Sequence, residues 1–481
     1  MKLDRQGFSV SHGPSPARFS VAIVMLCLSA CGGGGGGGGA PQPEPAPDPA
    51  PPVAEDACGV EAQKAFVLEV ADDWYRWYDE MAVVDPRDFA TAQDLLDALT
   101  APLAEDFRDP GFSYVTTITE DRINLSTGAY VGFGFRYAID EEGHYLISDA
   151  FEGGSAFAAG FRRGVELLAV DRGQGFESMR ELEVQDASLT SIFGAAEVGL
   201  ERGFRLRGAD SVFEVEIAKT RLDIPALVAA PRTVERSGLP PVAYLHLRRF
   251  ISSANADLAE AFADFSEQGI TDFVIDLRFN SGGSVNVADF LLDLLAGRVA
   301  DGEIAFRVTH NDKRSSEDTD SRFSARAESV DPLRIAFLTS ESTASASELV
   351  INSLAPYFDL ALIGSDTSGK AVGQYAFDLD DCDTRLRLVT FETQNADGLG
   401  GYYTGLADTG RFTLCPVQDS YRGAFGSRDE PLLAAALSWL DEGACGAIGV
   451  ADTASASRAL RRGPGWIRAI DYPDRRSSWV Q

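Results

Sequence analysis

The sequence predicts a multidomain protein of mixed α+β and α/β class, in which a small helical segment and a β-rich domain precede a largely parallel α/β sheet. Three observations predict this. The chain has 481 residues, more than a single hydrophobic core usually serves. Its apolar residues have helical spacing near the start, and then form short β-type runs broken by glycine. From Pro241 onward, segments typical of strands and helices alternate, which indicates a parallel sheet covered by helices.

Residues 1–30 have the pattern of a signal peptide. Basic residues precede an apolar run, 19–30, that is too short to cross a bilayer as a helix. The run ends in Leu28-Ser29-Ala30-Cys31, which resembles the bacterial lipobox, where a peptidase cuts before the cysteine and a diacylglycerol is attached to its sulfur. Residues 31–57 are rich in Gly and Pro and are typical of a tether. We expect an exported protein, anchored through Cys31 to the cell envelope, on the periplasmic side of the outer membrane.

Composition restricts the partners. The formal charge of −31 opposes binding to nucleic acid, because Lys and Arg would have to neutralise the phosphates and here Asp and Glu dominate. No CxxC or HExxH spacing occurs, so we expect neither a metal nor another cofactor. The expected partners are protein or peptide substrates, and the membrane through the lipid. The sequence carries no indication of an oligomeric state.

Four cysteines remain in the exported chain once residues 1–30 are removed and Cys31 is lipidated. An oxidising compartment favours two disulfides among them. Four cysteines allow three pairings, and we favour Cys382 with Cys415 and Cys58 with Cys445.

Residues 58–112 are expected to form a helical N-terminal domain. Two segments carry apolar residues about one helical turn apart. The first has Phe66, Val70, Trp74 and Trp77, and the second has Leu95, Leu96, Leu99 and Leu103.

Residues 113–222 resemble a PDZ domain. The resemblance lies in the loop Gly132-Phe133-Gly134-Phe135 and in the glycine-bounded segment 153–164, with short β-type runs on either side. In such a domain, glycines let consecutive backbone N–H groups converge on a peptide's terminal carboxylate, and the next strand edge pairs with the peptide. The resemblance therefore implies a peptide site at Gly132, Phe133, Gly134 and Phe135.

Residues 223–450 are assigned to a catalytic domain, because the chemistry of parallel sheets gathers beyond the carboxyl ends of the strands. Two polar connections occur there, at 278–283 and at 341–345. The basic segment that follows, 451–481, is expected to be disordered.

Three motifs in this domain occur in the order Asp276-Leu277-Arg278-x-Asn280-x-Gly282-Gly283, Thr343-Ala344-Ser345-Ala346-Ser347-Glu348 and Gly369-Lys370-x-x-x-Gln374. They resemble the carboxyl-terminal processing (tail-specific) serine peptidases over roughly residues 60–445. The resemblance implies a ClpP/crotonase-like core with Ser345 as nucleophile, Lys370 as general base and Gln374 as its support. It implies a serine endopeptidase that acts on envelope proteins recognised by their C-termini.

The spacing of Ser345 and Lys370 also allows the two residues to meet, independently of the family resemblance. Lys370 stands 25 positions after Ser345. A helix of eleven residues rises about 16 Å and a five-residue strand returns about 17 Å, which brings Lys370 back level with Ser345. A serine at a helix N-terminus lies where free N–H groups favour an oxyanion, so we expect the donors to be Ala346 and either Gly282 or Gly283.

The glycine turn departs from the family pattern at Phe279 and Ser281, and Ala371 replaces the customary glycine after the base. We expect these departures to alter the oxyanion loop more than the type of reaction.

The same sequence admits three alternatives. The segment 364–370 has the outline of a phosphate-binding P-loop, but Ala371 stands where that motif needs Ser or Thr. A Ser-His-Asp triad on His246 or His310 has little support, because His246 alternates within an apolar strand. A non-catalytic PDZ scaffold on a peptidase-like fold remains open.

The serine motif recurs around Ser455 without a Glu or a later Lys, so this motif alone predicts little.

Overall fold

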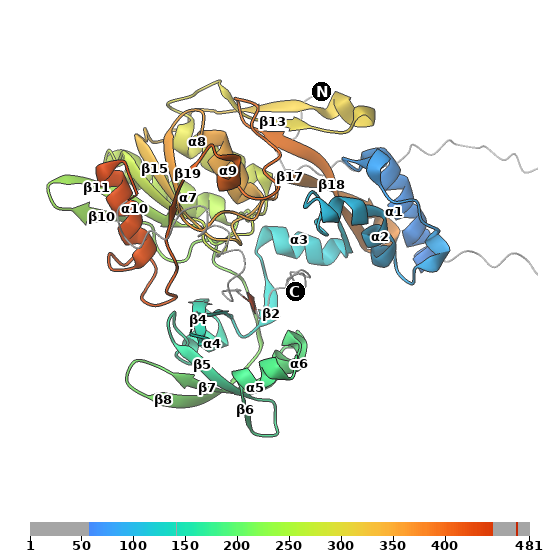
Figure 1. Cartoon of the computed structure of the whole chain (residues 1–481), viewed down its shortest axis with the longest axis horizontal. Coiled ribbons are helices and arrows are strands. Elements are labelled where there is room, and N and C mark those ends of the chain that lie inside the picture. The colour runs from blue at the N-terminus through green and yellow to red at the C-terminus, as the bar shows by residue number, and fades with distance from the viewer. Residues whose placement is uncertain (1–56, 141, 446–467, 470–481) are drawn as a thin grey trace, which may run out of the picture.

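The computed structural model describes residues 57–140, 142–445 and 468–469. Figure 1 shows a β-rich unit at the bottom, a larger unit of sheets and helices above it, and helices α1 and α2 at the right. The predicted signal peptide, Cys31 and nearly all of the predicted tether lie outside the described residues. Within the described part of the chain, no helix has the length and apolar character needed to span a membrane.

The N-terminal part is helical, as expected, with α1 at Val60–Trp74 and α2 at Ala92–Glu105. The Thr91 hydroxyl caps α2 by accepting a hydrogen bond from the Asp94 N–H at 3.0 Å. All four predicted leucines of α2 are buried. In α1 the buried residues are Lys64, Val67 and Ala71. Of the predicted stripe, Phe66, Val70 and Trp74 are partly buried, and Trp77, which follows the helix, is buried.

The β-rich unit is built around one sheet in the order β20-β3-β4-β5-β7-β8, with β6 beside β5. Its core is a cluster of phenylalanines that pack edge to face, such as Phe133 and Phe204 at 5.1 Å between ring centroids. Short helices α4, α5 and α6 and the pair β2 and β9 complete it. The strands are β2 Tyr130–Gly132, β3 Phe135–Ile139, β4 Tyr145–Ala150, β5 Glu166–Asp171, β6 Phe176–Ser178, β7 Glu201–Arg207, β8 Val212–Ala218, β9 Thr220–Leu222 and β20 Arg468–Ala469; the helices are α4 Ser155–Ala158, α5 Met179–Val184 and α6 Leu189–Phe193.

The larger α/β unit contains a sheet in the order β10-β11-β12-β15-β16-β19. Its neighbours are parallel from β11 to β19, and only β10 runs antiparallel at the edge. The central strands are almost wholly buried, which explains why they are continuous apolar runs in the sequence. The prediction of a largely parallel sheet is confirmed. The strands are β10 Arg232–Arg236, β11 Leu239–His246, β12 Asp272–Asp276, β15 Arg334–Thr339, β16 Asp359–Gly364 and β19 Thr413–Pro416.

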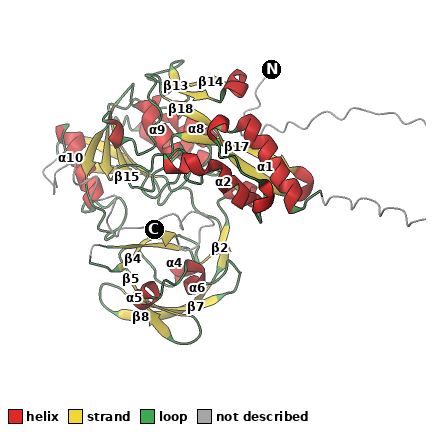
Figure 2. Cartoon of the chain, turned by 45° about the vertical axis from the view of Figure 1, so that its right-hand side comes forward, coloured by secondary structure: helices red, strands yellow, loops and turns green. Residues whose placement is uncertain are grey.

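Helices cover both faces of this sheet (Figure 2). One face of the strands shares a core with α7 Ala254–Glu267, α8 Val285–Ala296 and α9 Ala346–Leu354. The alternate residues of the same strands pack against α10 Pro431–Glu442 on the other face.

A second sheet joins the α/β unit to the helical N-terminal part. In it β18 lies between β1 and β13, and β17 also pairs with β18. Residues of β18 and β17 share a core with α1 and α2. The elements are β1 Tyr114–Thr116, α3 Ile118–Ser126, β13 Ile304–Thr309, β14 Thr319–Arg322, β17 Val372–Leu379 and β18 Thr384–Gln394.

The four cysteines form two disulfides, but the favoured pairing was wrong. Cys58 is bonded to Cys382, and Cys415 to Cys445. The packing explains both pairs. Cys58 precedes α1, which packs on the hairpin whose turn holds Cys382. Cys415 lies on β19, and Cys445 follows α10, which packs against the same sheet.

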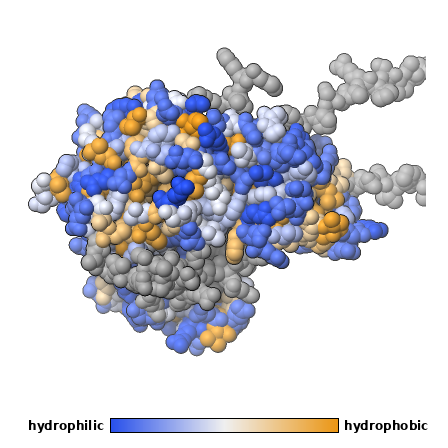
Figure 3. Space-filling model, turned by 45° about the horizontal axis from the view of Figure 1, so that its top comes forward, coloured by the Kyte–Doolittle hydropathy of each residue, from blue (hydrophilic) through white to orange (hydrophobic). Residues whose placement is uncertain are grey.

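Within the segment 451–481, Arg468–Ala469 form β20 and pair with β3. The rest of that segment, Ser455 included, lies outside the described residues. On the described surface, the face in Figure 3 is mostly hydrophilic, with scattered hydrophobic side chains. That is ordinary for a globular protein.

Candidate active site

Ser345 lies at the start of α9, after the polar turn that follows β15. Its φ is 57° and its ψ is −115°, a backbone region that L residues rarely occupy. Such strain persists only where the surroundings hold it, and it clusters at functional sites. Ser345 is half-buried, whereas every residue of α9 behind it is buried. The turn therefore presents the serine at the edge of the core.

Lys370 lies in the segment between β16 and β17, as the spacing argument required. Its Nζ donates a hydrogen bond to Gln374 Oε1 at 2.8 Å. The same Nζ lies 4.7 Å from the centroid of the Phe112 ring, and Gln374 Nε2 donates to the Phe112 carbonyl. Lys370 and its predicted support are thus in contact, and Phe112 helps to hold both.

Glu348 links the segment of Ser345 to the segment of Lys370. Its Oε2 accepts hydrogen bonds from the Ser345 N–H at 2.8 Å and from the Lys370 N–H at 2.9 Å. Its Oε1 accepts another from the Gly369 N–H at 2.7 Å. One carboxylate therefore fixes the backbone on both sides of the candidate site.

Glu348 is completely buried, and this affects its protonation. Burial raises the pKa of Glu348 to about 7, although hydrogen bonds from Thr367 and from the three backbone N–H groups act in the opposite direction. Sequence analysis assigned Glu348 no role. The available signal was its place three residues after a serine at a helix N-terminus, the spacing of a capping box.

The glycine turn packs directly against Ser345. A Cβ placed on Gly282 would lie 2.8 Å from the Ser345 Cβ and 2.9 Å from the Ala346 nitrogen. Gly282 has a φ of 98°, so glycine is required there for both space and backbone. A Cβ on Gly283 would lie 2.2 Å from the Phe250 carbonyl oxygen.

The predicted oxyanion donors are therefore close to the serine. The Gly282 N–H already donates to Asn280 Oδ1 at 2.9 Å. The Gly282 N–H is therefore already used, and the remaining predicted oxyanion donors are the N–H groups of Gly283 and Ala346.

Hydrogen bonds join the turn that carries Ser345 to the glycine turn, and the first runs from the Phe279 N–H to Ser340 Oγ at 3.1 Å. Thr343 Oγ1 donates to the Leu277 carbonyl at 2.8 Å. The Ala344 N–H and the Ser347 hydroxyl both donate to the Asn280 carbonyl, at 3.1 Å and 3.0 Å. The two motifs that the sequence separates by more than sixty residues are thus one hydrogen-bonded structure.

A buried group of charges supports the glycine turn from behind. Arg278 is fully buried and pairs with Asp276 at 2.6 Å and with Glu430 at 2.8 Å. Burial acts to raise the pKa of Asp276, but Arg278, His246 and the hydrogen bond from Tyr244 together outweigh it and hold the pKa at about 2. His246 lies beside this group, and burial lowers its pKa to about 4. The prediction that His246 is a packed strand residue agrees with this position.

The predicted peptide loop of the β-rich unit lies between β2 and β3. Phe133 and Phe135 turn their rings into the core, so only the backbone of this loop is available for binding. Gly134 has a φ of 89° and packs against Gly154, which explains the need for glycine. The structure does not bring this loop into the Ser345 site.

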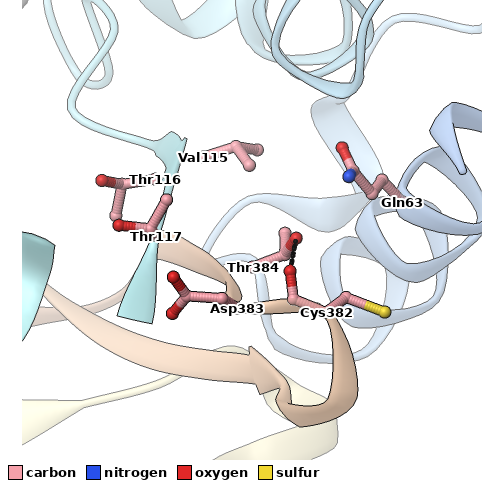
Figure 4. Close-up of a pocket in the computed structure, with 7 residues that line it drawn as sticks. All are labelled: Gln63, Val115, Thr116, Thr117, Cys382, Asp383 and Thr384. Atoms are coloured by element: carbon pink, nitrogen blue, oxygen red, sulfur yellow. Dashed lines mark hydrogen bonds between the residues drawn. The ribbon is translucent and has the colours of Figure 1, made fainter. Parts of the chain in front are cut away.

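A pocket of about 400 Å³ lies elsewhere, at the turn between β17 and β18. Figure 4 shows Thr116, Thr117 and Asp383 on one side and Gln63 on the other, beside the disulfide cysteine Cys382. None of the predicted catalytic, oxyanion or peptide-binding residues lines it. Among the described residues, one group could offer three metal ligands, Asp140, Glu142 and His144, in the turn after β3.

Comparison with known proteins finds matches over two parts of the chain. Residues 241–402 match the model of Peptidase family S41, and residues 62–114 match that of the Peptidase S41 N-terminal domain. The chain is similar to S41 peptidases. The predicted similarity to carboxyl-terminal processing peptidases is confirmed. The family matches cover the helical N-terminal part and most of the α/β unit.

Curated relatives carry the same description. A carboxyl-terminal-processing protease of Synechocystis is 24% identical over 294 residues, covering 61% of this chain and 64% of the relative. The chloroplastic C-terminal processing peptidase of Tetradesmus obliquus is 30% identical over 270 residues, covering 53% and 54%. The chain thus spans between about half and two thirds of the length of these S41-type relatives.

A solved structure has the same fold. The crystal structure of a Bacteroides fragilis protein described as an S41 protease aligns with a TM-score of 0.61 at 24% identity. The alignment covers 79% of this chain and 97% of that one. The mixed α/β multidomain fold is therefore shared with an S41-type structure.

Proposed function

We propose that this protein is a serine endopeptidase that uses Ser345 as nucleophile and Lys370 as general base. The observation that carries the proposal is the Glu348 carboxylate, which is bonded to the N–H groups of both residues. A nucleophile and a base must be held within reach of each other, and a shared buried acceptor does this at little entropic cost. The similarity to S41 peptidases supports the reaction type.

The proposed reaction is acyl transfer through Ser345. Lys370 takes the proton of the Ser345 hydroxyl as Oγ attacks the scissile carbonyl carbon. Backbone N–H groups of Ala346 and of the glycine turn stabilise the oxyanion that forms. The peptide nitrogen then leaves with the proton from Lys370, and water hydrolyses the acyl-enzyme by the same route in reverse. Gln374 orients the amine without a charge that would favour the ammonium form.

Substrate capture is assigned to the β-rich unit, within residues 113–222, as in a PDZ domain. The loop from Gly132 to Phe135 would receive a protein's C-terminal carboxylate on its backbone N–H groups. Catalysis is assigned to residues 223–450. The lipobox at Cys31 supports attachment to the cell envelope, with envelope proteins as the substrate class.

The test of catalysis is cleavage of an unfolded protein with an apolar C-terminus by the purified protein. We expect Ser345→Ala and Lys370→Ala each to reduce the cleavage rate by about 10³-fold or more. Two matched controls should cleave as wild type does: Ser455→Ala, in the repeated serine motif, and Lys313→Ala, an exposed lysine paired with Asp72.

If wild type cleaves nothing but still binds peptides, the alternative of a non-catalytic scaffold is correct. Equal cleavage by either active-site variant would reject the assignment of its residue.

Carboxylate capture has its own test. The same substrate with an amidated C-terminus should be cleaved more slowly, because it lacks the anion that the Gly132–Phe135 loop receives. An unchanged rate would argue against capture by the C-terminus and would leave the Ser345 assignment intact.

A further inference from the structure

Strand β20 comes from a distant part of the same chain and adds to the sheet of the β-rich unit. Arg468 lies opposite Tyr137 and Ala469 lies opposite Arg136, in antiparallel register with β3. Figure 1 shows this short strand, in red, beside the β-rich unit, whose other elements come from residues 130–222. No other described strand of that sheet comes from outside those residues.

The position that β20 fills is the open edge of the sheet. The order β20-β3-β4-β5-β7-β8 makes β3 the terminal strand whenever β20 is absent. An edge strand presents a row of N–H and C=O groups that an extended peptide can pair with. Peptide recognition by strand addition uses such an edge, with backbone hydrogen bonds supplying affinity. The edge that β20 fills is therefore one at which an extended peptide would bind.

The direction of β20 is that of a captured peptide. Moving forward along β20 moves backward along β3, toward Phe135 and the glycine loop before it. A substrate C-terminus in the same direction would reach the loop proposed to bind its carboxylate. Ile470 follows Ala469 in the sequence, so β20 pairs as an internal segment and brings no carboxylate of its own at that point.

One side chain of β3 also reaches the turn that leads to the candidate active site. Arg136, the residue opposite Ala469, extends its guanidinium to the α/β unit, where Nη1 donates to the Phe279 carbonyl at 3.3 Å. Phe279 opens the turn that carries Gly282, which packs against Ser345. A peptide on the β3 edge would therefore be held beside the turn that serves catalysis.

We infer that the segment Arg468–Ala469 is a resident competitor of substrate: it occupies the β3 edge and must leave before a substrate peptide can pair there. This inference rests on the peptide capture proposed above. A segment tethered to its site competes at an effective concentration that reaches the order of millimolar for short linkers. A free peptide of modest affinity would therefore bind wild type weakly.

The test is peptide binding with the competitor removed. In an antiparallel pair, adjacent residues alternate in pointing their N–H toward the partner, so one of the two N–H groups of β20 faces β3. The double variant Arg468→Pro/Ala469→Pro removes that donor whichever residue carries it. The probe is a fluorescein-labelled peptide with the sequence of residues 464–472, and the readout is its Kd from fluorescence anisotropy. All proteins carry Ser345→Ala, so binding is measured without cleavage.

We expect the double variant to bind the probe about tenfold or more tightly than the parent. The control Ser477→Pro, a proline later in the same segment, should bind as the parent does. A probe carrying prolines at the positions of Arg468 and Ala469 should not bind the double variant, which ties the signal to strand pairing.

Equal affinity of the double variant and the parent would overturn the inference, and so would equal binding of the two probes. Amide hydrogen exchange gives a second readout that needs no ligand: exchange at Arg136 or Tyr137 should speed up in the double variant, and unchanged exchange counts against the inference. Failure of the proposed function is a separate result, since it appears as lack of cleavage with Ser345 present. The binding comparison stands whatever that assay shows.

Discussion

Glu348 is the residue on which the geometry of the site depends most. It is the N3 residue of α9, yet its carboxylate reaches both the turn before its own helix and the segment after β16. The Glu348 side chain accepts three backbone N–H groups in a buried place. Gln has the same shape, but its amide has an NH₂ donor where the carboxylate has a second acceptor oxygen.

Glu348→Gln should therefore abolish most activity while leaving the fold intact. The amide would turn an NH₂ group toward at least one backbone N–H, and a buried donor left unsatisfied costs about 1 to 3 kcal/mol. We expect kcat to fall by about 10² or more, measured on the unfolded protein substrate, with a melting temperature lowered by only a few degrees.

The matched control is Glu317→Gln, an exposed glutamate outside the site. Full activity of the Glu348→Gln variant would show that the bridging carboxylate is not needed for positioning.

His246 gives a residue-scale prediction about pH. Burial lowers the pKa of His246 to about 4, from 6.5 in the unfolded chain. Between these values the unfolded state binds the proton and the folded state does not. The free energy of unfolding therefore decreases as pH falls from about 6.5 to about 4. Asp276, Asp149, Arg278 and Arg248 are the charges that act on this imidazole.

The size of the effect is about 3 kcal/mol, from a difference of about 2.5 pH units. Urea titrations measure the free energy of unfolding at each pH. Over this interval, we expect that of wild type to drop by about 3 kcal/mol more than that of His246→Gln. Parallel pH curves for wild type and His246→Gln would contradict the assignment.

Sequence reasoning succeeded at residues whose partners are near in the sequence or fixed by regular elements. Lys370 and Gln374 are in contact, four residues apart. One helix and one strand after Ser345, the Lys370 N–H reaches the same Glu348 oxygen as the Ser345 N–H. It missed Phe112, which contacts Lys370 from another part of the chain, because no local periodicity reports such a contact. It also gave no warning of the positive φ at Ser345 and Phe279, since neither is a glycine.

At the scale of elements, the glycine turn and the start of α9 act as one. Gly282→Ala should disable the site, because the new Cβ would lie 2.8 Å from both the Ala344 carbonyl oxygen and the Ser345 Cβ. The turn would have to move, and displacement of a nucleophile by about 1 Å is enough to lose about 10² in rate.

The control separates clash from backbone strain. Gly302 also has a positive φ, of 81°, but a Cβ there meets nothing within 4 Å. Gly302→Ala should therefore lose some stability and keep its activity. If Gly282→Ala is as active as Gly302→Ala, the turn does not pack on the serine as described.

The parallel sheet was predictable because its strands are buried on both faces and leave continuous apolar runs. The second sheet was not, since it pairs β1, β13, β17 and β18 from three distant regions. The disulfide pairing was not predictable for the same reason. Cys382 lies at the turn of the β17–β18 hairpin, and the contact of that hairpin with α1 brings Cys58 to it. Strand β20 escaped prediction because a two-residue strand has no pattern of its own.

At the scale of the whole molecule, buried ion pairs join the β-rich unit to the α/β unit. Asp149 on β4 pairs with Arg248 after β11, with Nε to Oδ2 at 2.9 Å, and both side chains are buried. Arg163 of the β-rich unit also pairs with Asp419. These contacts hold the β-rich unit against the α/β unit.

Asp149→Asn should loosen this junction, because it leaves the Arg248 charge buried without its partner. Removing one member of a buried pair lowers the free energy of unfolding by about 3 to 5 kcal/mol. The comparison is Asp331→Asn, which removes the exposed pair with Arg298 and should change it by less than about 1 kcal/mol. Urea titration measures both, and equal effects would place Asp149 outside a buried junction.

The central claim is that Ser345 is a nucleophile activated by Lys370, and covalent labelling tests it most directly. The purified protein is treated with a fluorophosphonate, which reacts with activated serines, and the modified residue is located by peptide mass spectrometry. We predict one adduct, on Ser345, which is absent from Lys370→Ala and retained in Lys313→Ala. An adduct on another serine, or labelling of Ser345 that does not depend on Lys370, would contradict the account.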